Sequence, residues 1–325
     1  AKHHTDVKES QFLRILRGDT PLVTKTGSLP TFVCGGMRVA PQALFSFRHK
    51  LCRAVFRADA ARLSLNLFEA LNKLHSDVGV VHCDLSCGNV AVCLKNANCP
   101  LGHKDCELII VLLDLAMNTL PGDLCRGQET PTATPPEGMI LHGLVHQRGD
   151  PQGDVWAAGV IVFRALFYCY PFVSLDGKNP WRGTDRLCLV INGLGEKNIE
   201  VLNERVNPMA VTPAYDTANA PLGNKEANDR VTKRVKDAIK EARTIQENGF
   251  QAQIEAAQCS QENKLFGHVV NNATLQYHGN RATTEEVIRR IKVHMDFFPV
   301  QMHSFNSYQA VNQILSPILH QQGHK

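Results

Sequence analysis

The run from Val155 to Tyr170 constrains the fold more than any other part of the sequence. Wound as a helix, it is apolar on nearly every face, which is typical of a helix buried inside a domain. A membrane span is the alternative, but Asp154 stands at its edge and Arg164 lies inside it. The run therefore predicts a core helix with protein on all sides.

Composition and charge narrow the class of protein. The chain has 325 residues, enough for one large or two modest domains, and 43% of them are hydrophobic and 20% charged. A formal net charge of +4 is small for this length, so we expect neither nucleic acid nor a membrane as the main partner. The cysteines number eleven, and residues 1–10 are polar rather than signal-like. These features predict reduced thiols in an intracellular, cytoplasmic protein.

Hydrophobic periodicity predicts the other elements. Leu63, Leu67, Leu71 and Leu74 recur at helical spacing, which indicates a helix over residues 57–76. The further expected elements are short strands at 90–94 and 107–113, a charged amphipathic helix over 225–261 with a possible break at Gly249, and a helix over 284–298. The first strand follows the polar segment at 82–89 directly, and the second precedes the motif at 114–116.

Five short motifs follow one another along the chain. They are HCDLSCGN at 82–89, DLA at 114–116, PPE at 135–137, DVWAAG at 154–159 and NRAT at 280–283. Any one of them is a weak signal, because short motifs occur often by chance. Five in this order, with a predicted strand and a buried helix between them, form a specific pattern.

The order of these motifs resembles that of eukaryotic-type protein kinases. The first is similar to the family's catalytic loop, H-R-D-L-x-x-x-N, and the second to its D-F-G motif. The resemblance covers residues from about 75 to 300. It implies an α+β, protein-kinase-like fold with a mainly helical C-lobe.

The resemblance assigns the chemistry to three residues. Asp84 would be the catalytic base that orients the acceptor hydroxyl. Asn89 and Asp114 would hold the magnesium ions bound with ATP. The implied cofactors are therefore ATP and Mg²⁺.

Four further residues would support the site by resemblance. His82 opens the catalytic loop, and Asp154 would hold this loop through its backbone amides. Arg281 would form a buried ion pair with Glu137 and so fix the activation segment.

The N-terminal part departs from the family's pattern. A short amphipathic helix is also expected over residues 7–16, and no Gly-rich phosphate loop precedes it. In this helix Glu9 stands in the place of the family's helix glutamate. No strand lysine fits as its partner: Lys2 stands near the terminus, and Lys25 follows the helix. The resemblance thus implies a reduced N-lobe. Either the sequence is an N-terminally truncated form of an active kinase, or the protein is a natural half-kinase that binds partners.

Two departures in the C-lobe bear on regulation and on the acceptor. Cys83 replaces the arginine that receives an activation-loop phosphate, so we interpret Thr130, Thr132 and Thr134 as a flexible polar loop. Ser86 replaces the lysine common in serine/threonine kinases, and the tyrosine-kinase alternative is absent too. Serine or threonine is preferred over tyrosine only as the commoner class of acceptor.

These observations divide the chain into expected units. They are a partial N-lobe at 1–36, a C-lobe core at 37–202, an insertion with a charged helix at 203–276, a closing C-lobe helix at 277–298 and a tail at 299–325. The charged helix is either a solvated, packed helix or a docking arm for a partner protein.

Two functions remain open from the sequence. The first is a protein kinase that transfers the γ-phosphoryl group of ATP to a protein hydroxyl. The second is a catalytically inactive pseudokinase that serves as a binding or scaffold module. Both have a protein as substrate or partner.

Overall fold

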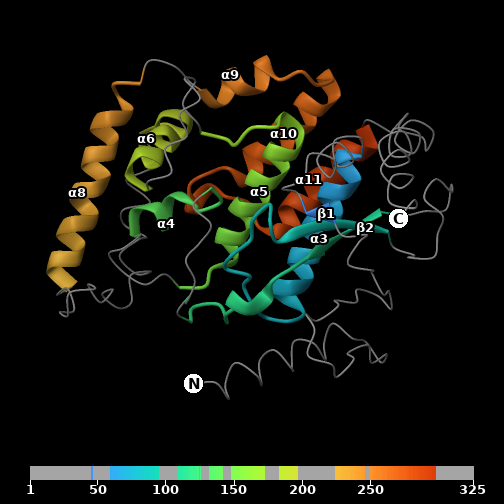
Figure 1. The fold of residues 1–325 in the computed structure, drawn as a ribbon, viewed down its shortest axis with the longest axis horizontal. Coiled ribbons are helices and arrows are strands. Elements are labelled where there is room, and N and C mark those ends of the chain that lie inside the picture. Colours follow the sequence, from blue (N-terminus) through green and yellow to red (C-terminus); the bar gives the residue numbers. More distant parts are fainter. Residues whose placement is uncertain are drawn as a thin grey trace, which may run out of the picture.

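The structure of the protein, a computed structural model, describes a set of ranges along the chain (Figure 1). These ranges are 45–46, 59–94, 108–123, 125, 132–141, 148–172, 183–196, 224–245 and 249–297. Their elements are β1 (Phe45–Ser46), α3 (Ala60–Ser76), β2 (Val90–Leu94), β3 (Leu108–Leu112), η2 (Leu115–Met117), α4 (Pro136–Leu141), α5 (Pro151–Phe167), α6 (Gly183–Leu194), α8 (Asn224–Ala242), α9 (Gly249–Ala256), α10 (Gln261–Thr274), η4 (His278–Asn280) and α11 (Thr284–Phe297).

Helix α5 is the central element, as its apolar run predicts. It begins earlier than the run, because Asp150 caps it by accepting the Gln152 N–H at 3.0 Å and Pro151 occupies its first turn. It ends where Tyr168 adopts a left-handed conformation with φ 60°. Figure 1 shows α3 and α11 on one side of α5, with α4, α6 and α8 on the other.

Helix α3 confirms the predicted leucine stripe. Leu63, Leu67 and Leu71 have no exposed surface, and α3 packs against α5, α11 and β3. A hydrogen bond from Thr284 Oγ1 to Asn72 Oδ1, at 2.7 Å, joins α11 to α3 across 212 positions of sequence. The first and last described helices therefore form one layer of the core.

The sheet is small and antiparallel, in the order β1-β2-β3. Strands β2 and β3 are the two that the sequence predicts, paired from Val90 opposite Leu112 to Leu94 opposite Leu108. A separate bridge joins Val81 to Thr119, just outside this hairpin. The sheet therefore ends next to the 82–89 loop on one strand and next to Asp114 on the other.

Helix α10 belongs to the core and not to a separable insertion. A Cβ on Gly159 of α5 would lie 2.7 Å from the Thr274 Cβ, and one on Gly267 of α10 would lie 2.5 Å from the Phe167 ring. These contacts require close approach of α5 and α10. The C-terminal end of the expected 203–276 unit is thus packed on α5. The bounds of this unit stay a prediction, and its residues 203–223 lie outside the described residues.

The predicted charged helix is two helices. Helix α8 ends at Ala242, where Asn192 Nδ2 donates to the Ala242 and Ile245 carbonyl oxygens at 3.4 and 3.0 Å. Gly249 begins α9 instead of breaking a longer helix. Helix α8 packs on α6 and α4 at the edge of the molecule (Figure 1).

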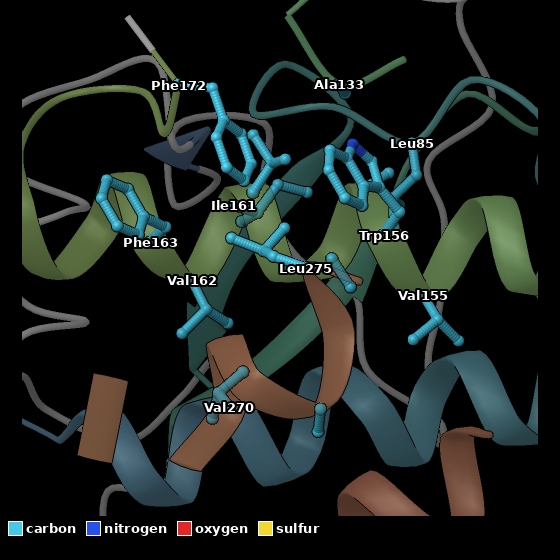
Figure 2. Packing of buried hydrophobic residues seen from close by; sticks show 14 of the residues in the cluster. Leu85, Ala133, Val155, Trp156, Ile161, Val162, Phe163, Phe172, Val270 and Leu275 are labelled. Atoms are coloured by element: carbon cyan, nitrogen blue, oxygen red, sulfur yellow. The ribbon is translucent and has the colours of Figure 1, made fainter. Parts of the chain in front are cut away.

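One hydrophobic cluster runs through all these helices. Figure 2 shows its centre, where Trp156 and Phe172 stack with ring centroids 5.6 Å apart. Leu85 and Ala133 belong to the same cluster and lie at the Trp156 end of α5. The loop and the 132–135 segment are thus anchored in the core. In the part of the chain that the structure describes, no helix has the length and apolarity that a membrane crossing requires.

Candidate functional site

The 82–89 loop is held by hydrogen bonds to Asp154, in the first turn of α5. Its Oδ2 accepts the His82 N–H at 2.7 Å, and its Oδ1 accepts the Cys83 N–H at 3.1 Å. The Asp154 side chain is 3% exposed, and a buried carboxylate needs such donors to offset its lost hydration. The contact is the one expected for Asp154. It also fixes Cys83, whose φ of 64° is unusual for a residue other than glycine.

His75 is a third partner of Asp154 that the sequence analysis missed. Its Nε2 lies 2.8 Å from Asp154 Oδ2, and its side chain is also buried. It stands in the last turn of α3, seven positions before His82, and belongs to none of the five motifs. Position at a helix end beside a predicted loop was the one signal that could have found it.

The His82 ring joins the loop to the strand that precedes Asp114. Its Nε2 donates to the Leu113 carbonyl oxygen at 3.0 Å, and the Asp84 N–H approaches its Nδ1 at 3.4 Å. The two contacts are satisfied together when the ring proton is on Nε2. His82 therefore connects both halves of the predicted site without reaching its surface, because it is fully buried.

Asn89 closes the loop back on Asp84. Its Nδ2 donates to the Asp84 carbonyl oxygen at 2.7 Å and to the Asp84 Oδ2 at 3.2 Å. The Asn89 N–H donates to the Ser86 carbonyl oxygen at 2.9 Å. Because the amide nitrogen is directed to Asp84, the amide oxygen Oδ1 is the atom left to act as a ligand.

Asp114 is tied to Asn89 through its neighbour. The Leu113 N–H donates to the Asn89 carbonyl oxygen at 2.8 Å, so Asp114 stands one residue beyond a direct bond to Asn89. Asp114 itself is exposed and left-handed, with φ 55°, at the start of η2. The structure thus brings Asp84, Asn89 and Asp114 to neighbouring positions at one end of the β2–β3 hairpin.

The donor set of this cluster suits a hard cation. Two carboxylates and an amide oxygen are the ligand types that Mg²⁺ takes, usually with several waters and phosphate oxygens. Within the described ranges no three His, Cys, Asp or Glu side chains gather closely enough to hold a metal by themselves. Asp84 and Asp114 are only two such groups, so magnesium would depend on Asn89 and on oxygens from a bound phosphate.

A second buried carboxylate, that of Glu137, is paired with an arginine that contacts the first turns of α5. Arg281 Nη1 lies 2.7 Å from Glu137 Oε1, and the side chains are 0% and 7% exposed. Arg281 also donates to the Gln152 carbonyl oxygen at 2.6 Å and lies over the Trp156 ring at 5.1 Å. This is the ion pair expected from the sequence, and it joins α4 to the segment just before α11.

The flexible polar loop expected at Thr130, Thr132 and Thr134 is wrong for the two threonines that the structure describes. Thr132 and Thr134 are buried, each 7% exposed, and the Thr132 carbonyl oxygen accepts Arg186 Nη2 at 2.6 Å. The expectation failed because small polar residues between prolines give no hydrophobic pattern, although they pack against the core. Thr130 lies outside the described residues, as do Glu9 and the whole 1–36 unit and 299–325 tail.

Comparison with known proteins adds no relative. A scan of the chain against models of protein families gives no match, and a search among curated proteins gives none either.

Proposed function

We propose that this protein is a protein kinase, with the described residues forming the C-lobe of a kinase-like fold. The proposal depends on one observation: Asn89 bonds the Asp84 side chain and, through its carbonyl oxygen, the residue before Asp114. This places Asn89 in contact with the Asp84 carboxylate and one residue from Asp114, which supports assigning to these three residues the tasks that phosphoryl transfer requires of a protein.

Each residue has a distinct task in this proposal. The Asp84 carboxylate orients the acceptor hydroxyl and takes its proton, and the Asn89 contact keeps this carboxylate in place. The Asn89 and Asp114 oxygens hold magnesium. ATP, bound with Mg²⁺, supplies the phosphoryl group. Serine and threonine are the proposed acceptors, in a protein substrate.

The supporting contacts explain how such a loop stays in place. Asp154 fixes the amides of His82 and Cys83, and His82 fixes the carbonyl group of Leu113. Positioning supplies much of the rate in such a reaction, and buried hydrogen bonds are the means of positioning available here. We also place the protein inside the cell, in the cytoplasm, where ATP is available and an odd set of eleven cysteines stays reduced.

A pseudokinase that acts as a scaffold is the second candidate. It is favoured by Ser86, which stands within the 82–89 loop where serine/threonine kinases commonly have a lysine. The same C-lobe could then present a binding surface without transferring phosphate.

Two measurements on the full chain separate these functions. The first follows transfer of labelled γ-phosphate from ATP to a mixture of unrelated proteins with Mg²⁺, for the wild type and for Asp84→Asn. The kinase proposal expects label on serine or threonine that falls by about 100-fold or more in the variant. The second measures the thermal shift of the protein with ATP and Mg²⁺. If no protein is labelled and the melting temperature does not change, the scaffold is the function that remains.

A further inference from the structure

Residues 132–141, here called the 132–141 segment, are held at their start by an arginine from a distant element. Arg186 of α6 is buried and donates through Nη2 to the Thr132 carbonyl oxygen at 2.6 Å. Burial lowers the pKa of Arg186 to about 10, so the side chain still carries its charge near neutral pH. The middle of the segment is fixed by Arg281 on Glu137.

The end of the segment is held by Arg234 of α8. Its Nη1 donates to the Ile140 carbonyl oxygen at 2.8 Å and approaches the Met139 carbonyl oxygen at 3.4 Å. The last carbonyl groups of a helix have no partner within the helix, and a cation there also meets the negative end of the helix dipole. Arg234 therefore caps α4 from another helix.

Helix α8 is anchored in the core beside Arg234. Val231 and Val235 are buried on either side of Arg234, against the common core. At its far end, Arg243 makes a two-point contact with Glu196, with both distances at 2.7 Å. The part of α8 around Arg234 is thus packed on the core.

The 132–141 segment borders the loop that carries Asp84. Ala133 and Leu85 belong to one hydrophobic cluster, and Figure 2 shows both at the Trp156 end of α5. Because Leu85 follows Asp84 directly, the segment and the loop with the proposed base are anchored in the same part of the core.

We propose that Arg234 is a positioning residue that holds the 132–141 segment in place for a protein acceptor, without a phosphate on Thr132 or Thr134. Both threonines are buried in this arrangement, and three guanidinium groups already bind the segment, at Thr132, Glu137 and Ile140. The role toward the acceptor rests on the proposed kinase function; the holding of α4 does not. Helix α8 then acts on the site without touching it, because Arg234 binds the backbone carbonyl groups of α4.

The experiment compares Arg234→Met with Arg234→Lys and with Lys233→Met in the full chain. Lys233 is exposed on the same helix, so its variant controls for lost charge and for a changed α8. Hydrogen exchange of peptides from 136–141 is measured against peptides from α3. We expect Arg234→Met to speed exchange in 136–141 by about tenfold or more, with α3 unchanged, and Arg234→Lys to restore part of the protection.

A kinetic arm uses the protein substrate that the labelling assay reveals. Arg234→Met should raise KM for this substrate by about fivefold or more while kcat stays within about twofold, because the variant leaves Asp84 and Asn89 untouched. A merely structural role would instead lower the apparent kcat through loss of folded enzyme and leave KM unchanged.

The outcomes separate the two proposals. Unchanged exchange in 136–141 overturns the role of Arg234, whatever the activity. Faster exchange with an unchanged KM overturns its role toward the acceptor. If the wild type transfers no phosphate, the proposed kinase function fails, and exchange alone then decides whether Arg234 holds α4.

Discussion

Arg281 and Glu137 lie 144 positions apart in the sequence, and their side chains meet through two contacts, Nη1–Oε1 at 2.7 Å and Nη2–Oε2 at 3.1 Å. The guanidinium also donates to the Gln152 and Gln276 carbonyl oxygens, so the pair lies at the crossing of three segments. Among the described ion pairs its two side chains have the least exposed surface, 0% and 7%.

Breaking this pair on one side should destabilise the protein strongly. Glu137→Gln leaves the buried guanidinium without its counter-charge, and we expect a loss of about 3 kcal/mol in the free energy of unfolding, measured by urea denaturation. The double variant Glu137→Leu with Arg281→Met removes both charges and should recover more than half of that loss. Equal stability of Glu137→Gln and the wild type would contradict a buried, functional pair.

The Asp154 network gives a second prediction about stability. Asp154→Asn replaces a carboxylate that accepts from three donors by an amide with one acceptor oxygen, so we expect a loss of about 2–4 kcal/mol by urea denaturation. His75→Phe, which removes one donor and keeps an aromatic ring, should cost about 1–3 kcal/mol.

His75→Gln is the matched control, because its amide can still donate to Asp154. It should retain more stability than His75→Phe. If the two variants unfold at the same urea concentration, the hydrogen bond from His75 contributes nothing and shape alone explains its burial.

Two glycines of α5 test the close packing with α10. A Cβ at Gly159 would lie 2.2 Å from Thr274 Oγ1, whereas a Cβ at Gly153 meets nothing within 4 Å. Gly159→Ala should therefore lower the free energy of unfolding by about 2 kcal/mol or more through overpacking. Gly153→Ala should raise it by about 0.5–1 kcal/mol, since alanine favours the helix. A neutral Gly159→Ala would show that α10 moves away from α5 at little cost.

Asp150 gives a prediction about acid stability. Burial alone would raise the pKa of Asp150, but the hydrogen bond and charge of His278, the Gln152 N–H and the charge of Arg281 together hold it below its ordinary value. A carboxyl group with a lowered pKa stabilises the fold above its ordinary value of about 4 and loses that contribution as pH falls further. Wild-type stability should thus fall between about pH 5 and pH 3 more steeply than that of Asp150→Asn.

Asparagine keeps the cap of α5 but cannot ionise, so it isolates the titration from the capping. Thermal unfolding of both proteins over this pH range measures the difference. Parallel curves would mean that Asp150 makes no contribution that depends on its charge.

The sequence predicted those parts that depend on apolar spacing or on ordered motifs. The leucine stripe of α3 implies a helix with one buried face, and the apolar run of α5 implies a helix buried in the core. The structure has both helices as expected. The contacts of Asp154 and Arg281 were expected because the order of motifs implies them. The assignment of the fold and of the chemistry to a kinase stays a proposal.

What could not be predicted depends on contacts with no sequence pattern. Arg234 binds backbone carbonyl groups, which every residue carries, so nothing in the sequence marks its partner. His75 meets Asp154 only because α3 ends beside α5. The burial of Thr132 and the end of α8 at Ala242 depend likewise on Arg186 and Asn192, which are far from them in sequence.

The pairing of α3 with α11 has a consequence for biosynthesis. The ribosome completes the leucine face of α3 long before it adds Thr284, the residue that bonds Asn72 across 212 positions. Until α11 emerges, the nascent chain keeps part of this apolar face uncovered, in the condition that attracts chaperones and promotes aggregation. Folding of the core therefore cannot finish before α11 has emerged, and a pause before residue 284 would prolong the exposure of α3.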